Sequence, residues 1–368
     1  MKKILLIGNY PPPLCGWAIQ TKLVAAELQR RGHTCKVLKI NENRKVKDPA
    51  YVDVQGGFDY LFKVAAYAMR GYRLNVHLNG QSRKGYLLAL AALLGAYLGF
   101  RPALATFHGG LSQTYFPRPD SPRLRRAFRL LFALAGGVAC DNEQVRQAIV
   151  GYGINPGKVA AIETFSSQYL DFQTVNLRPE IETFLQSHSP VFFCYLSFRP
   201  EYKLDMLRSA MAAFHQVRPR AGFVWLGFPD REMPEAGKFL DGWPASEREA
   251  LLLLPNLPHD EFLSLMSRCD ACIRTPACDG VAASVLESLC LGIPVVASEN
   301  GARPLGAVTY KADDPSDLTA KLRFVTEHSA SLRAGLGERS AADNVGRMAD
   351  WLTSRFDSRN RAEVAHAT

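Results

Sequence analysis

Short apolar runs alternate with longer amphipathic stretches along the first half of the chain. The first run, KILLIG at residues 3–8, precedes a helical pattern at 18–31 that ends at Gly32, and a second run, CKVLKI, follows at 35–40. Near-continuous apolar strands separated by helices are typical of a parallel sheet that is covered on both faces. The sequence therefore predicts a doubly wound α/β half at the N-terminus.

The same alternation begins again at VFFCYLS, after a stretch without sustained apolar periodicity. A chain of 368 residues is longer than a single domain with one hydrophobic core usually is. We therefore expect two Rossmann-like domains that face each other across a cleft. The expected parts are an N-terminal domain, a linker, a C-terminal domain, and a helical tail that can pack back on the N-terminal domain, at residues 1–170, 171–190, 191–342 and 343–368.

Composition places the chain among soluble globular proteins, with 47% hydrophobic and 21% charged residues. The apolar run at the N-terminus is too short for a secretory signal. The longest apolar stretch, residues 85–100, contains glycines and is shorter than the roughly 20 residues that span a bilayer. We expect a core helix there and a cytoplasmic protein.

The net charge of +9 raises the question of an anionic partner. Its densest cluster lies at residues 121–135, where Arg123, Arg125, Arg126 and Arg129 accompany an apolar helical face. Such a helix can contact anionic lipid on the inner face of a membrane, or it can be an ordinary solvated helix, and both interpretations remain open. No recognisable nucleic-acid-binding module accompanies the charge, so we do not expect nucleic acid as a partner.

Eight cysteines invite a test for metal binding. Cys269 and Cys272 form a C-x-x-C, followed by Cys278 and Cys290. No histidine joins them at a spacing typical of zinc ligands. We expect buried reduced thiols, with no metal site and no cofactor.

The stretch CDGVAASVLESLCLGIPVVAS at residues 278–298 predicts a loop, a helix, a sharp stop and a buried strand. Gly280 allows a tight turn, and the small residues that follow it leave the helix N-terminus open to an anion such as a diphosphate. Asp279 on the loop and Glu287 inside the helix can then reach different ends of a hydroxyl-rich ligand. The alternative is a helix-capping Asp and a surface Glu.

This stretch resembles the signature of family 4 glycosyltransferases, which are retaining, nucleotide-sugar-dependent enzymes of GT-B fold. That signature is an acidic residue, seven residues, a glutamate, and then small-x-G-x-P-V-V-A-[ST]. Residues 9–38, 198–205 and 257–276 resemble further parts of the family in the same order, so the resemblance covers nearly the whole chain.

The resemblance implies roles for individual residues in the C-terminal half. Glu287 would hold the ribose hydroxyls of the nucleotide, and Asp279 would contact the donor sugar, with the backbone of Gly280, Val281, Ala282 and Ala283 nearby. Arg199 and Lys203 resemble the basic pair that neutralises the donor diphosphate. Two cations there would stabilise the leaving nucleoside diphosphate in place of a metal ion. The alternative for this pair is an ordinary surface loop.

In the N-terminal half, the resemblance implies two further residues. His108 follows a predicted strand and resembles the family's histidine near the donor sugar. Gly16 would bring the backbone close to the diphosphate or the transferred sugar. A lone loop histidine is more often incidental, so this role depends on the resemblance.

Three departures from the family pattern affect the expected chemistry. Asp279 stands where the family usually has Glu. Cys15 and Trp17 flank Gly16, where the family often has Gly-Gly, and Gly227 is a single glycine where a G-x-G is usual. These departures leave the identity of the donor sugar undetermined and are compatible with impaired catalysis.

We therefore expect a retaining glycosyltransferase that moves a sugar from a nucleotide sugar to a glycan or lipid-linked glycan, in polysaccharide or lipopolysaccharide biosynthesis. Its expected catalytic residues are His108, Asp279, Arg199 and Lys203. The alternatives are a nucleotide-sugar epimerase of the same fold, a catalytically degenerate nucleotide-sugar-binding subunit and, last, a basic nucleic-acid binder.

Overall fold

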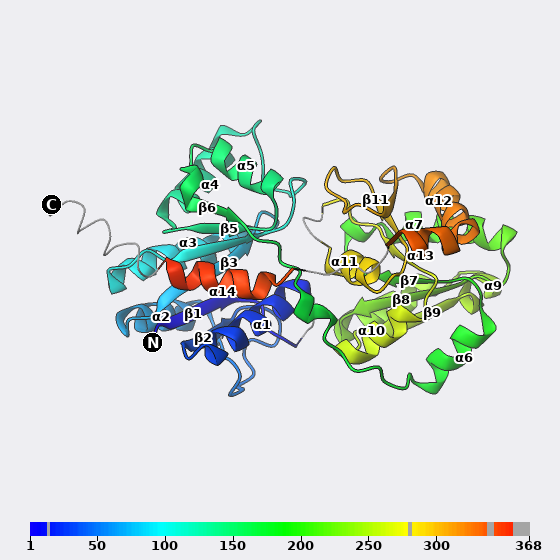
Figure 1. Cartoon of the computed structure of the whole chain (residues 1–368), viewed down its shortest axis with the longest axis horizontal. Helices are drawn as coiled ribbons and strands as arrows, with labels where there is room; N and C mark the ends of the chain where they lie inside the picture. Colours follow the sequence, from blue (N-terminus) through cyan, green and yellow to red (C-terminus); the bar gives the residue numbers. More distant parts are fainter. Residues whose placement is uncertain (13–14, 279–281, 337–341, 356–368) are drawn as a thin grey trace. The chain divides into compact units, whose positions relative to one another are not determined.

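The computed structural model of the chain describes residues 1–12, 15–278, 282–336 and 342–355. The chain forms two compact units (Figure 1). The first unit consists of Met1–Gln168 together with the segment that begins at Ala342, and the second consists of Tyr169–Ala341. Each unit is built on its own six-stranded parallel sheet, so the predicted pair of doubly wound sheets is confirmed.

The first sheet has the strand order β2-β1-β3-β4-β5-β6, and all its neighbours are parallel. Alternate residues of β1 point to opposite faces, so that Leu5 and Ile7 join one apolar core and Ile4 and Leu6 the other. The strands are β1 (Lys3–Gly8), β2 (Thr34–Lys39), β3 (Arg73–Asn79), β4 (Leu104–His108), β5 (Val138–Cys140) and β6 (Val159–Ala161).

The helices of the first unit are shared unequally between the two faces. In right-handed crossovers, the direction of the step along the sheet decides which face the helix covers. The step from β1 to β2 places α1 (Gly16–Arg30) on one face, and the four later steps run the opposite way. Their helices therefore pack on the other face: α2 (Gly57–Met69), α3 (Arg83–Ala96), α4 (Pro122–Leu134) and α5 (Glu143–Gly151). Short 3-10 helices are η1 (Tyr97–Gly99), η2 (Pro156–Lys158) and η3 (Ser167–Leu170).

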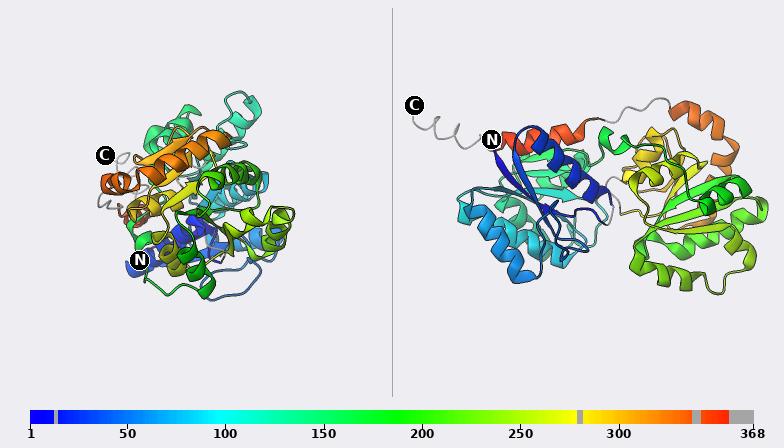
Figure 2. Two further views of the ribbon diagram at one scale, coloured as in Figure 1. Left: turned by 90° about the vertical axis from the view of Figure 1, so that its right-hand side faces the viewer. Right: turned by 90° about the horizontal axis from the view of Figure 1, so that it is seen from below.

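The helix α14 (Asn344–Ser354) returns to the first unit and shares the sheet face with α1 (Figure 2). Its Val345, Met348 and Trp351 pack in one apolar core with Leu104 and Ala139 from the middle of the sheet. Those strand residues lie beyond the reach of α1 alone, because α1 belongs to the β1–β2 end. The last described helix therefore supplies part of the core of the N-terminal unit.

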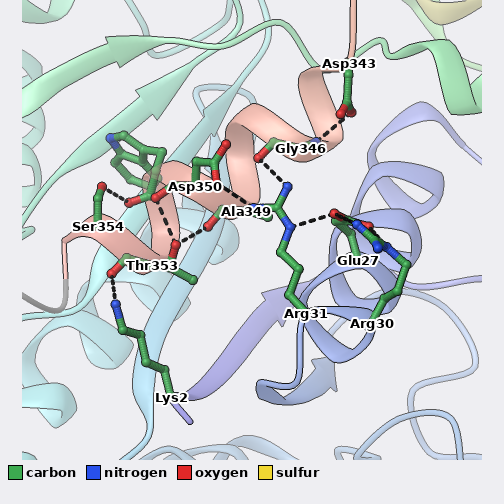
Figure 3. A network of polar contacts seen from close by, with 11 residues as sticks. Lys2, Glu27, Arg30, Arg31, Asp343, Gly346, Ala349, Asp350, Thr353 and Ser354 are labelled. Atoms are coloured by element: carbon green, nitrogen blue, oxygen red, sulfur yellow. Dashed lines mark hydrogen bonds and ion pairs between the residues drawn. The ribbon is translucent and has the colours of Figure 1, made fainter.

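Polar contacts fix α14 in this place (Figure 3). The guanidinium of Arg31 lies 2.5 Å from a carboxylate oxygen of Asp350 and 2.6 Å from one of Glu27. At the other end of the helix, Lys2 Nζ donates to the carbonyl oxygen of Thr353 at 2.7 Å. The helix is thus held to both α1 and the start of β1.

The second sheet has the order β12-β11-β10-β7-β8-β9, again all parallel. Its strands are β7 (Val191–Tyr195), β8 (Gly222–Phe228), β9 (Leu251–Pro255), β10 (Ala271–Arg274), β11 (Val295–Ser298) and β12 (Ala307–Tyr310). One face packs against α7 (Leu204–Val217), α8 (Met233–Leu240) and α12 (Pro315–Glu327), and the other against α6 (Pro179–Ser187), α10 (His259–Ser267) and α11 (Ala283–Cys290). The remaining helices are η4 (Pro200–Tyr202), η5 (Asp230–Glu232), α9 (Ala245–Glu249) and α13 (Ser329–Leu336).

Residues 171–190, expected to be the linker between the domains, contain α6. Ile181 and Phe184 of this helix are buried in the core of the second unit. A nine-residue helix that buries two positions three apart is too short to produce a sustained apolar period. Among the residues that the structure describes, no helix is long and apolar enough to cross a membrane.

Candidate functional site

The predicted site residues lie near the point in each sheet where the strand order reverses. In the first sheet this point is between β1 and β3, and in the second it is between β7 and β10. Loops at the carboxyl ends of such strand pairs diverge, and ligands of doubly wound sheets bind there. The described candidates are Gly16 and His108 in the first unit and Arg199, Lys203, Ala282, Ala283 and Glu287 in the second. Asp279, Gly280 and Val281 lie outside the described residues.

The loop after β7 carries the predicted basic pair. Arg199 is exposed just before η4, and Lys203 adopts a left-handed conformation, with φ of 53°, immediately before α7. Lys203 Nζ lies 3.1 Å from Asp313 Oδ1, in an ion pair whose side chains are 44% and 61% exposed. A pair this exposed contributes about 0–1 kcal/mol, so a phosphate group can compete with Asp313 for the ammonium.

The loop after β10 is joined to the loop after β7. Thr275 Oγ1 donates to the carbonyl oxygen of Tyr202 at 2.7 Å, and Arg274 Nη1 donates to that of Tyr195 at 3.3 Å. The Arg274 guanidinium also lies 5.4 Å from the ring centroid of Tyr202. Arg274 is therefore a further cation at the reversal point, and it was not among the residues predicted from the sequence. The sequence feature that points to Arg274 is an arginine at the end of an otherwise apolar strand.

Glu287 is the most unusual residue of this region. Its side chain is 3% exposed on α11, and within the described part of the chain no hydrogen bond or ion pair reaches its carboxylate. Burial raises the pKa of Glu287 to about 8. A buried acid without a donor is costly, and it becomes favourable when a ligand supplies hydroxyl groups.

The start of α11 lies between Glu287 and the undescribed loop. Ala282 is the N-cap residue, and its side chain makes no capping hydrogen bond. Ala283 is the first helical residue, so the first backbone N–H groups of the helix have no N-cap side chain to accept from them. This end of the helix favours a negatively charged group.

Two neighbouring features restrict the shape of the loop after β7. Gly227 at the end of β8 has a φ of +105°, and a Cβ there would lie 2.7 Å from the Tyr195 ring and 2.9 Å from the Leu196 carbonyl oxygen. Ser197 Oγ donates to Glu232 Oε2 at 3.0 Å, and the Phe198 amide donates to the same oxygen at 2.8 Å. The single glycine of the second unit's βα loop is therefore needed for close backbone packing.

In the first unit, His108 belongs to a buried polar network. It is the last residue of β4 and 7% exposed, and its Nε2 lies 3.1 Å from Nδ1 of His77 on β3. Trp17 Nε1 donates to the same Nδ1 at 2.8 Å. The Asn75 side chain lies 3.0 Å from Nε2 of His77. Loops and strands on both sides of the reversal point thus converge on two histidines.

The donor groups determine where the hydrogens of this network lie. An indole N–H can only donate, so Nδ1 of His77 is an acceptor and its hydrogen is on Nε2. The Asn75 side-chain nitrogen lies 3.0 Å from Nε2 of His77, so this assignment requires the Asn75 amide to be turned so that its oxygen accepts that hydrogen. Burial lowers the pKa of His77 well below its usual value, which keeps this ring neutral.

The opposite side of His108 faces a carboxylate. Thr164 Oγ1 lies 3.3 Å from His108 Nδ1 and 2.5 Å from Asp141 Oδ1, which is itself 3.7 Å from that Nδ1. The Gly109 amide donates to Asp141 Oδ2 at 2.8 Å. Asp141 and Thr164 thus lie on the Nδ1 side of the His108 ring. His77 and Asp141 were not among the residues predicted from the sequence, although the polar residues at alternate positions of β3 were a signal for His77.

The two cysteines of the C-x-x-C lie in the interior of the second unit. Cys269 and Cys272 are buried free thiols, and burial raises the pKa of Cys272 to about 12. No group of three or more His, Cys, Asp or Glu residues capable of holding a metal ion occurs within the described ranges.

Neither a protein-family model nor a curated protein matches the sequence. Solved structures do match. HepE of Anabaena in complex with UDP-glucose has a TM-score of 0.67 at 13% identity, over 99% of both chains. A glycosyltransferase from Rickettsia africae has a TM-score of 0.66 at 16% identity, over 96% of this chain and 99% of its own. UDP-GlcNAc 2-epimerase of Methanocaldococcus jannaschii, in complex with UDP-GlcNAc and UDP, has 0.64 at 13% identity, over 96% of this chain and 100% of its own.

At these identities the likeness establishes the fold alone, which is the GT-B type with two Rossmann-like domains. The specific resemblance to family 4 glycosyltransferases rests on the sequence motifs.

Proposed function

We propose that the chain is a glycosyltransferase that binds a uridine diphosphate sugar at the reversal point of the second sheet. The observation that carries this proposal is Glu287, a buried carboxylate that lacks any partner within the described residues. Vicinal ribose hydroxyls would supply the two donors that it lacks, since a carboxylate accepts through both oxygens. Its position in α11, behind the helix start, fits a nucleoside whose diphosphate extends towards the loops.

The diphosphate would lie among the cations of the second unit. Arg199 and Lys203 follow β7, Arg274 ends β10, and the uncapped start of α11 adds its partial positive charge. These groups would stabilise the charge that develops when the bond between the sugar and the diphosphate breaks. In this proposal no metal ion is required. Asp279 would contact hydroxyls of the transferred sugar.

The nucleotide is proposed from the solved structures, because HepE and the Methanocaldococcus epimerase are both complexes with uridine nucleotides. The acceptor is proposed to be a glycan or lipid-linked glycan bound near Gly16 and His108. Retention would follow from attack on the same face from which the diphosphate leaves. The acceptor oxygen would bond to the anomeric carbon, and its proton would pass to the departing phosphate oxygen.

Epimerisation of a nucleotide sugar is the second candidate. It is favoured by the likeness to the Methanocaldococcus 2-epimerase, which matches this chain as well as the Rickettsia glycosyltransferase does. An epimerase inverts a carbon of the sugar and needs no acceptor. A transferase consumes the nucleotide sugar at a useful rate only when an acceptor is present.

Thermal stabilisation by nucleotides tests the site before any acceptor is known. UDP and UDP-sugars should raise the melting temperature of the wild-type chain, since they bind the folded state. Glu287→Ala should lose that response, whereas Glu235→Ala, at an exposed position of α8, should keep it. Absence of stabilisation by every nucleotide, in a folded protein, would contradict the proposal. Incubation with the stabilising UDP-sugar alone then separates the two reactions, because only an epimerase produces a new sugar isomer.

A further inference from the structure

The outward sides of α2, and of α3 with the 3-10 helix η1 that follows it, are apolar and exposed. Phe58 is 92% exposed, Phe62 72% and Leu87 62%, although residues of this kind are normally buried. In each helix these side chains recur at helical spacing, so they form a stripe rather than isolated positions. We call this surface the apolar face, and it consists of Phe58, Phe62, Met69, Leu87, Leu94 and Leu98.

The two stripes form one surface because the helices pack closely. A Cβ added to Gly95 of α3 would lie 2.8 Å from Val64 Cγ1 of α2, which leaves no room between them. Near the start of the helices the surface opens into a groove of about 400 Å³, lined by residues that include Phe58, Leu61, Leu87 and Lys84. The inward sides of both helices are already occupied in the core of the first unit.

The charge around the apolar face is predominantly positive. Residues 56–134, from the start of α2 to the end of α4, contain eleven Lys and Arg residues against two Asp and no Glu. Their net charge of +9 equals that of the whole chain. The excess positive charge of the protein is therefore concentrated on the part of the first unit that carries the exposed apolar residues.

The helix α4 contributes charge to this surface but little apolar area. Its Phe128, Leu131 and Phe132 are buried, whereas Arg123 and Arg126 are exposed. It packs beside α3, where Tyr86 Oη donates to the Ala127 carbonyl oxygen at 3.0 Å. The apolar side of residues 121–135, for which contact with lipid was one of two interpretations, thus faces the core. The arginines stand next to the apolar face of α2 and α3.

We propose that the apolar face docks on the surface of an anionic lipid bilayer. Exposed Phe and Leu side chains enter the boundary between headgroups and acyl chains, while flanking Lys and Arg residues attract anionic headgroups. A second copy of the chain is a poor occupant, since it would place one surface of charge +9 against another. This inference goes beyond the proposed sugar chemistry and does not depend on it.

Sedimentation of the full chain with lipid vesicles tests the proposal. The wild-type protein should bind vesicles that contain phosphatidylglycerol more tightly than vesicles of phosphatidylcholine alone, and added salt should weaken the binding. The double variant Phe58→Ser, Phe62→Ser should bind these vesicles at least about tenfold more weakly, because two exposed aromatic anchors are removed. Arg123→Gln with Arg126→Gln should reduce the preference for the anionic lipid.

Matched variants on the second unit are the controls. Leu305→Ser removes a side chain that is 88% exposed, and Arg218→Gln with Arg220→Gln removes two exposed cations. These controls should bind vesicles as the wild type does, and all variants should melt near the wild-type temperature because the altered residues are exposed. Failure of the wild type to bind anionic vesicles would overturn the proposal. So would undiminished binding by the Phe58, Phe62 variant, or a wild-type dimer that this variant abolishes, which would assign the face to a second copy.

Discussion

Replacement of Glu287 by Gln should stabilise the folded protein in a pH-dependent manner. Burial raises the pKa of this carboxyl from 4.5 to about 8. Between these values the folded state holds a proton that the unfolded state has released, so the free energy of unfolding of the wild type falls as the pH rises. This difference in pKa corresponds to a loss of at most on the order of 5 kcal/mol of unfolding free energy. The full loss is reached at pH values above the folded-state pKa. Gln has nearly the same size and carries no charge, so it removes this cost.

Hydrogen–deuterium exchange of peptides from β10 and α11 measures the effect in the second unit alone. Wild type and Glu287→Gln should open equally at pH values below 4.5, and the variant should become progressively more protected up to about pH 8. The exposed Glu235→Gln, on α8, is the matched control and should show no pH-dependent gain.

A constant difference between the two proteins across this range would refute the argument, because it would mean that the carboxyl titrates alike in both states. The same variant should lose most of its stabilisation by UDP. If Glu287→Gln gains stability and loses UDP binding, then Glu287 serves ligand binding and lowers the stability of the folded protein.

Three further outcomes follow from the remaining contacts. Trp17→Phe removes the donor to His77, so the ring ¹⁵N signals of His77 should change from a single Nε2–H tautomer to a mixture, as measured by NMR; unchanged signals would contradict the assigned hydrogens. Asp350→Ala should cost about 0.5–1 kcal/mol of unfolding free energy, as an exposed ion pair does, whereas Trp351→Ala should cost about 3–5 kcal/mol in urea denaturation. Equal costs would refute the view that apolar packing holds α14. Arg199→Ala should weaken UDP binding about tenfold or more but leave uridine binding unchanged in calorimetry, since only UDP carries phosphates.

Much of the fold follows from local pattern. The runs KILLIG and VFFCYLS became β1 and β7, the strands that start the two sheets, because parallel buried strands need apolar residues on both faces. Of their partners across each reversal point, β10 is apolar except for its final arginine, whereas β3 alternates polar and apolar residues. The site could be placed from this order, since the carboxyl ends of such strands are where doubly wound sheets bind ligands.

What the sequence did not reveal depends on contacts between distant segments. The Trp17–His77 hydrogen bond joins residues 60 positions apart, and Arg31 contacts Asp350 across 319 positions. No periodicity reports such pairs. The exposed side of α3 was hidden for another reason: an apolar stretch with no polar stripe predicts burial all round, whereas Leu87 and Leu94 face outward.

The position of α14 makes the second unit an insertion within the sequence of the first. During synthesis the strands of the first sheet leave the ribosome early, but the helix that covers Leu104 and Ala139 is made only after the whole second unit. The second unit is continuous in sequence and can complete its core first. Translation order and folding order are therefore reversed for the first unit, whose apolar sheet face waits for its last helix and needs protection until then.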